Sequence, residues 1–181
     1  MPFTRAFHHA ARAIAYAAKG DTANARKAQS VLLERAKLVP KEYSIGNNSC
    51  DTILGVVIPM VEGEILIREG KIESGIEQLR TAITMEDALK YDEPPGWLIP
   101  VRHSLGALLM KQQRFAEAEQ VYRDDLARLP ANGWSLLGLA ESLRQQKKNP
   151  DEAARIQAQF KKVWAKADLT IKSSCLCQPQ A

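Results

Sequence analysis

Apolar residues recur at steps of three and four along nearly the whole chain of 181 residues. Near the C-terminus, Ala153, Ile156 and Phe160 follow these steps while lysines fall on the opposite face, which is typical of an amphipathic helix with one face in a core. The one run of β-branched residues, 53–61, is interrupted by Pro59 and continues into a helical pattern. The sequence therefore predicts an all-α fold.

Glycine and proline divide this helical pattern into pairs. Short breaks predict tight turns inside the pairs, at Gly20-Asp21, Gly70-Lys71 and Asn149-Pro150. Longer links that contain proline separate the pairs from one another, at Pro40, at Pro94-Pro95 and at residues 130–133. This alternation predicts helix–turn–helix units joined by longer links.

The last two units resemble each other. Leu105-Gly106 and Leu137-Gly138 lie near the middle of the first helix of each unit, 32 residues apart. The second helix of the earlier unit contains Ala118 and Tyr122 and is followed by Pro130. Small residues at such positions let the two helices of a pair touch backbone to backbone, while large residues fill the space between neighbouring pairs.

This pattern resembles the tetratricopeptide repeat, in which a Trp, a Leu-Gly, an aromatic residue, an Ala and a closing Pro recur over about 34 residues. Trp134, Leu137 and Gly138 match the opening of that repeat. The resemblance implies an α-solenoid of about four antiparallel helix pairs, wound into a right-handed superhelix over residues 1–168. The repeats are expected at about 7–38, 55–89, 98–130 and 131–167. We expect residues 169–181 to form a flexible tail.

Two links are longer than the standard unit requires, by roughly sixteen and nine residues. The second one contains the segment YDEPPGWLIP, residues 91–100. One interpretation is architectural, with Pro94 and Pro95 ending a helix and Trp97 covering the end of the core. The alternative is that Asp92, Glu93 and Trp97 form one wall of a groove. The segment also resembles the closing repeats of longer bacterial tetratricopeptide proteins with no assigned activity, which implies a C-terminal portion or a short relative of such a protein.

In the family that the chain resembles, the first helices of the pairs line a concave groove that holds a peptide or a partner helix. The repeat frames place the following residues toward that groove: Glu64, Arg68, His103, Lys111, Asn132, Ser135 and Ser142. Trp97 or Met110 is expected to contact the apolar part of the ligand. Glu64 and the acidic middle of the chain favour a ligand that carries Lys or Arg.

Some members of the family clamp a terminal carboxylate with Lys and Asn at fixed positions of the first helices. The corresponding rows here are Ala10, Met60, His103 and Ser135, and Ile14, Glu64, Ala107 and Leu139. Because these rows offer no fixed cation or amide donor, the resemblance implies binding without a carboxylate clamp.

The net charge of +4 is unevenly distributed. Residues 1–40 carry seven basic and two acidic side chains, residues 41–100 carry five and eleven, and residues 141–181 carry eight and four. A nucleic-acid binder typically shows one basic stripe with interleaved aromatics, so we expect no nucleic-acid partner. The pattern fits solvated helix faces, or an acidic patch that meets a basic partner.

Motifs of catalysis and cofactor binding are missing from the sequence, including HExxH, GxGxxG, GxSxG and the phosphate-binding GxxxxGK[ST]. His8 and His9 are adjacent on a predicted helix and point about 100 degrees apart, so they cannot hold one ion between them. We therefore expect a non-enzymatic protein without a cofactor. No apolar run reaches the length of a membrane span and no secretory signal is visible, so we expect a cytoplasmic protein without a membrane partner.

Three cysteines do not make a disulfide framework, and a cytosolic setting favours reduced thiols. Cys175 and Cys177 form a Cys-x-Cys pair that can present two thiolates to Cu(I) or Zn(II), with further ligands supplied from elsewhere. The alternative is a frayed tail with ordinary exposed thiols.

The sequence thus predicts a protein–protein interaction module that binds a protein or peptide of unidentified sequence. One rival is a metal-handling or enzyme-accessory protein that uses the Cys-x-Cys tail. A second rival is a structural segment whose groove is filled by its own flanking residues. Membership of a longer chain and a homo-oligomeric state both remain open.

Overall fold

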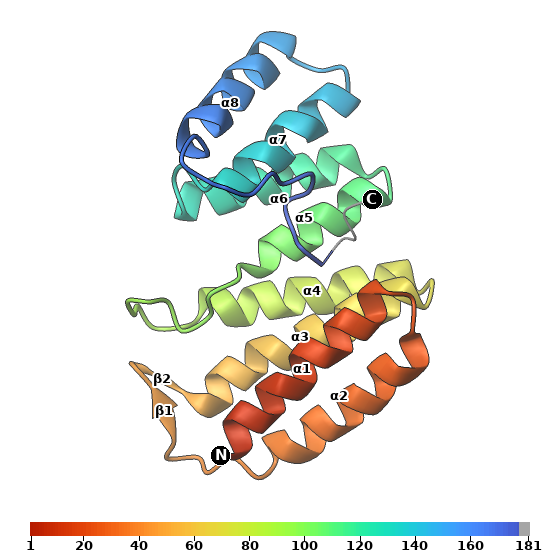
Figure 1. Ribbon diagram of the computed structural model, residues 1–181, viewed down its shortest axis with the longest axis vertical. Coiled ribbons are helices and arrows are strands. Elements are labelled where there is room, and N and C mark those ends of the chain that lie inside the picture. The colour runs from red at the N-terminus through yellow and green to blue at the C-terminus, as the bar shows by residue number, and fades with distance from the viewer. Residues whose placement is uncertain (178–181) are drawn as a thin grey trace. The chain divides into compact units, whose positions relative to one another are not determined.

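The computed structural model describes residues 1–177, and over this part of the chain it contains eight helices and one small hairpin (Figure 1). The prediction of an all-α fold is confirmed. The helices are α1 Pro2–Ala18, α2 Thr22–Ala36, α3 Cys50–Arg68, α4 Ile72–Asp87, α5 Val101–Lys111, α6 Phe115–Arg128, α7 Gly133–Gln145 and α8 Pro150–Val163. The strands β1 Ser44–Ile45 and β2 Asn48–Ser49 pair antiparallel in the link before α3. None of the described helices combines the length and apolar character needed to cross a lipid bilayer.

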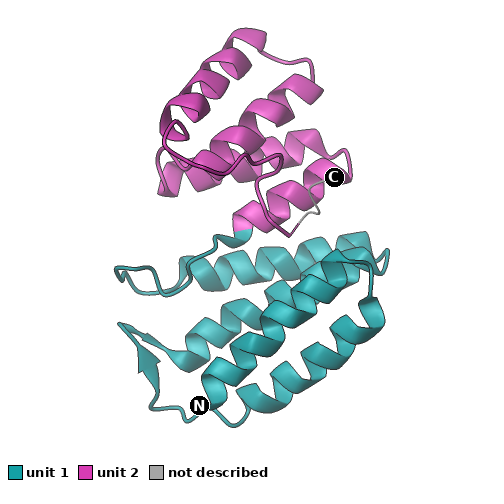
Figure 2. Ribbon diagram, viewed as in Figure 1, with its two compact units in different colours: residues 1–101 teal, residues 102–181 magenta. Residues whose placement is uncertain are grey.

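The chain forms two compact units, Met1–Val101 and the part from Arg102 onward (Figure 2). In unit 1, α1 pairs with α2 and α3 pairs with α4, and α3 packs against both helices of the first pair. Alanines make this packing close: Ala6, Ala10, Ala13 and Ala17 form the buried stripe of α1. Larger aliphatic side chains of α3 fill the space between the pairs.

The crossing of α3 and α4 brings two backbones into contact. A Cβ atom on Gly63 would lie 2.8 Å from the carbonyl oxygen of Gly75, and one on Gly75 would lie 2.9 Å from the carbonyl oxygen of Gly63. This is the kind of backbone contact that the sequence analysis expected at the small residues of the last two units. A side chain at either glycine would push the helices apart.

In unit 2 the Leu-Gly glycines have a different role from the one expected. Gly106 of α5 and Gly138 of α7 face the buried ring of Tyr122 on α6, and a Cβ atom on either glycine would collide with that ring. The two glycines therefore make room for an aromatic side chain, where the sequence predicted contact between two backbones. Tyr122 is 1 % exposed, and burial raises the pKa of its hydroxyl group.

We expect Gly138→Ala to destabilise unit 2, and Gly138→Leu to lower the free energy of unfolding by at least about 1–3 kcal/mol, because the added atoms overlap the Tyr122 ring. Gly55 of α3 is the matched control, since a Cβ atom there meets nothing within 4 Å. Gly55→Ala should be neutral or stabilising by up to about 1 kcal/mol through helix propensity alone. Denaturant titrations compare the variants, and equal stabilisation by both Ala substitutions would contradict the packing described for Tyr122.

A polar cluster joins α2 to α3. Arg26 donates hydrogen bonds to both carboxylate oxygens of Glu69, at 2.7 and 2.9 Å, and to Glu62, and Gln29 also donates to Glu62. The hydrogen bonds from Arg26, aided by Lys71, lower the pKa of Glu69 to about 2, and those to Glu69 and Glu62 raise the pKa of Arg26. The cluster fixes α3 on the surface of α2.

Since the pKa of Glu69 falls from 4.5 to about 2 on folding, its ionised form stabilises the protein above pH 4.5, and that contribution is lost as the pH falls toward 2. Glu69→Gln should lower the free energy of unfolding at neutral pH by about 1 kcal/mol and should flatten the acid dependence in this window. Glu34→Gln, at an exposed carboxylate of α2, is the control. Thermal melts from pH 7 to pH 2 check the prediction, which identical pH profiles for Glu69→Gln and wild type would refute.

Candidate functional site

The two long links of unit 1 bind each other. Asn48 is 3 % exposed, and its carboxamide accepts a hydrogen bond from the Lys90 N–H at 2.8 Å and donates one to the Lys90 carbonyl at 2.9 Å. The backbone N–H of Asn47 donates to the Asp92 carboxylate at 2.8 Å. Gly46 has a φ of +56° and leaves space for that carboxylate, which a Cβ atom would strike. The two links that are longer than the repeat period requires are thus connected into one joined structure through residues 46–48 and 90–92.

This joined structure walls an apolar cavity of about 650 Å³. The cavity is lined by side chains of α1 and α3, by the turn of the hairpin and by residues 92–99. The helical part of the lining consists of Phe3, Phe7, Ala10, Ala11 and Ile14 from α1 and Val57, Met60 and Val61 from α3. Because α1 and α3 are the first helices of successive pairs, the cavity lies on the side where the sequence predicted a groove.

Trp97 forms part of the wall. Its ring meets Phe7 edge to face, with ring centroids 5.7 Å apart, and Phe7 in turn packs on Phe3 at 4.6 Å. The indole N–H of Trp97 is buried and has no acceptor among the described residues. A buried donor without an acceptor is unfavourable by about 1–3 kcal/mol, so an acceptor brought by a ligand would gain an unusually favourable hydrogen bond.

The mouth of the cavity combines apolar and acidic groups. Ile45, Leu98 and Ile99 line it and are 47 %, 69 % and 57 % exposed. Asp92 and Glu93 also line it, and they are the titratable side chains of its described lining. A segment with an apolar side chain and a flanking cation would complement this surface.

The structure brings together only some of the predicted groove residues in unit 1. Trp97 lines the cavity, as do Ala10, Ile14 and Met60 from the rows where a carboxylate clamp would lie. Glu64 and Arg68 do not line it: they form a buried ion pair at 3.1 Å, one helical turn apart on α3. Phe3 and Phe7 are cavity residues that the sequence analysis missed, although their aromatic spacing of four residues was a visible signal.

In unit 2, two predicted groove residues are interior. His103 and Ser135 are 4 % and 0 % exposed, and both bind the buried carboxylate of Asp125, His103 through Nε2 at 3.2 Å and Ser135 by donating at 2.6 Å. Ser135 bonds the carboxylate and not the imidazole, so the three do not form a nucleophile–base–acid relay. Their contacts with Asp125 satisfy polar groups between α5, α6 and α7.

The other predicted residues of unit 2 have separate positions. Asn132 caps α7 by accepting hydrogen bonds from the backbone N–H groups of Trp134 and Ser135, and the buried Ser142 donates to the Leu139 carbonyl at 2.9 Å. Met110 lines a small cavity of about 120 Å³, and Lys111 is exposed at the end of α5. The structure therefore does not bring the predicted groove residues of unit 2 together along one groove.

The segment after α8 differs from the flexible tail that the sequence predicted. Ile171, Ser174, Cys175 and Cys177 are buried, and the hydroxyl of Ser174 bonds to the hydroxyl of Tyr122 at 2.7 Å and donates to the His103 carbonyl at 3.1 Å. The segment lacks helical periodicity, but its small side chains fit against α5 and α6. Residues 178–181 of the expected tail lie outside the described residues.

Cys175 and Cys177 are joined in a disulfide, and Cys50 is a free buried thiol. The expected pair of exposed thiolate ligands is therefore not presented, because the sulfur atoms are bonded to each other and largely covered. Burial raises the pKa of the Cys50 thiol, which keeps that cysteine protonated and unreactive.

We expect Ser174→Ala to destabilise the protein by about 1–3 kcal/mol, because it leaves the buried Tyr122 hydroxyl without its Ser174 partner. Ser173→Ala, at the half-buried neighbouring serine, is the matched control and should change the melting temperature little. In a double-mutant cycle with Tyr122→Phe, the coupling between positions 122 and 174 should be favourable. Equal melting temperatures for the two serine variants would mean that residues 171–177 do not support the fold.

No family model, no curated protein and no solved structure matches this chain. Its function is inferred from its own cavities, contacts and charges.

Proposed function

We propose that this protein is a non-enzymatic interaction module, a tetratricopeptide-like α-solenoid that holds a segment of a partner protein in the apolar cavity of unit 1. The observation that supports this most is the cavity itself, which two successive first helices line and the link containing Trp97 closes on one side. Its volume of about 650 Å³ falls within the range of protein ligand sites, which is about 300–1,000 Å³.

The lining defines the chemistry of the partner. An aromatic or branched aliphatic side chain would fill the space between Phe7 and Met60, and a backbone carbonyl of the partner would accept from the Trp97 N–H. A Lys or Arg beside that anchor would lie near Asp92 and Glu93. The cavity has no row of cations for a terminal carboxylate, which favours an internal segment of the partner.

Binding fits the site better than catalysis does. The titratable groups of the described lining are two carboxylates adjacent in the sequence, with no nucleophile or imidazole beside them. The metal-handling alternative has less support, since the two cysteines on which it depends are paired in a disulfide.

The test starts with a random peptide library displayed on phage and selected against the whole protein. Ala11 lines the cavity and is exposed, so Ala11→Trp should fill the cavity without disturbing the core. Ala15→Trp is the matched control, because Ala15 is an exposed alanine of the same helix that does not line the cavity. We expect the selected peptides to bind Ala11→Trp at least about tenfold more weakly, by fluorescence anisotropy, and Ala15→Trp as they bind wild type.

Affinity should also fall as salt is added, because a cation of the peptide would interact with Asp92 and Glu93 across a surface where charges are screened within about 8 Å at physiological ionic strength. Circular dichroism of both Trp variants verifies that they are folded. Peptides that bind Ala11→Trp and wild type with equal affinity would place the binding surface outside this cavity.

A further inference from the structure

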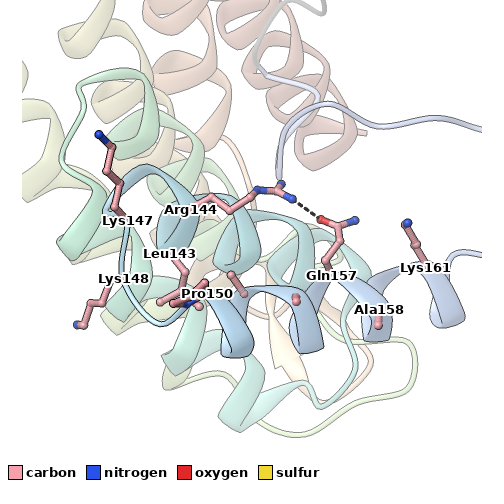
Figure 3. Close-up of a pocket in the computed structure, with 10 residues that line it drawn as sticks. Leu143, Arg144, Lys147, Lys148, Pro150, Gln157, Ala158 and Lys161 are labelled. Carbon is pink, nitrogen blue, oxygen red and sulfur yellow. Dashed lines mark hydrogen bonds between the residues drawn. The ribbon is translucent and has the colours of Figure 1, made fainter.

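A second groove lies in unit 2, between the end of α7 and α8 (Figure 3). Its volume is about 660 Å³. Along α8, Ala154, Gln157, Ala158 and Lys161 follow helical steps and face the groove, and the two alanines are exposed. Small side chains in this row leave room for the close approach of another helix.

Basic side chains surround the row of α8 residues that faces the groove. Figure 3 shows Lys147 and Lys148 extending from the turn after α7 and Lys161 at the other end of the groove. Arg144 is held in place, since it pairs with Glu141 at 2.6 Å and donates to the Gln157 carboxamide at 3.1 Å. Lys148 lies 3.5 Å from the Glu119 carboxylate, whereas Lys147 and Lys161 have no acidic partner among the described residues.

The chain contains its own example of how such a face is covered. In unit 1, α3 packs on α1 and α2. Arg26 of α2 binds Glu62 of α3 and Glu69, the residue that caps the end of α3 seven residues later, and Gln29 of α2 also binds Glu62. Gln29 follows the buried Ala25 by four residues, as Gln157 follows the buried Ala153. The groove in unit 2 therefore resembles the face of α2 that binds α3. In both, the second helix of the pair carries an alanine and, four residues later, a glutamine, with basic side chains nearby.

We propose that the α7–α8 groove binds an amphipathic helix of a partner protein that carries two acidic residues two turns apart, in the manner in which α2 binds α3. Alanine or leucine between the acids would lie on Ala154 and Ala158, and the acids would reach Lys147 and Lys161. A second copy of the chain would fit this basic groove poorly through its N-terminal helices, because residues 1–40 carry seven basic and two acidic side chains. The groove belongs to unit 2 and its residues are separate from those of the unit 1 cavity.

The probe is a synthetic Ala/Leu helical peptide with two glutamates seven residues apart on one face, titrated into ¹⁵N-labelled full-length protein. Two control peptides replace both glutamates with Gln or with Lys. We expect amide shift changes at α7, α8 and the turn between them, with weaker binding of the Gln peptide and none of the Lys peptide. Shift changes confined to other residues, or no binding at millimolar peptide, would overturn the proposal.

Charge reversal tests the assignment of the two lysines. The double variant Lys147→Glu/Lys161→Glu should weaken binding of the glutamate peptide at least about tenfold. The matched variant Lys162→Glu/Lys166→Glu makes the same change of net charge at exposed lysines that do not line the groove, and should bind as wild type. Equal weakening in both double variants would show attraction to net charge alone and would overturn the site. Self-association of the protein in sedimentation velocity, abolished by Lys147→Glu/Lys161→Glu only, would also overturn it by identifying a second copy as the occupant.

Discussion

A helix pair in this chain cannot cover its own apolar face, and the rest of the structure depends on what covers each pair. In unit 1 the face of α1 and α2 is covered by α3, fixed there by Arg26 between Glu62 and Glu69. In unit 2 the ring of Tyr122 fills the space that Gly106 and Gly138 leave, and the segment that contains Ser174 packs over part of the same helices. The two cavities of similar volume are lined by α1, α3 and the joined links in unit 1, and by α7 and α8 in unit 2.

The departures from the repeat period build the candidate site. A regular repeat would have joined the pairs with short turns. The two long links leave enough chain for the Asn48 carboxamide to bind both the N–H and the carbonyl group of Lys90. Further along the second link, the ring of Trp97 packs on Phe7 of α1. Helix α4 ends at Asp87, before the segment YDEPPGWLIP begins, so Pro94 and Pro95 do not end that helix, and residues 92–99 wall the cavity.

The sequence predicted the helices and the turns between them correctly, because these depend on periodicity and on residues close together in the chain. It did not predict the partners of His103, Ser135 or Asn48, since each bonds to a group 10 to 42 residues away whose position only the fold determines. The alignment with the tetratricopeptide repeat also placed several residues in the groove that the structure buries elsewhere. Glu64 forms an ion pair with Arg68 one turn away and is buried, although its position in the repeat suggested an exposed contact.

The central claim is that the unit 1 cavity holds a partner segment, and the indole N–H signals of the three tryptophans test it most directly. The Trp164 N–H already donates to the Leu169 carbonyl at 2.7 Å, whereas the buried Trp97 N–H has no acceptor among the described residues. On titration with a selected peptide, the ¹H–¹⁵N signal of Trp97 should move downfield as it gains an acceptor, while that of Trp164 stays in place. Saturated binding with an unmoved Trp97 signal would contradict the account.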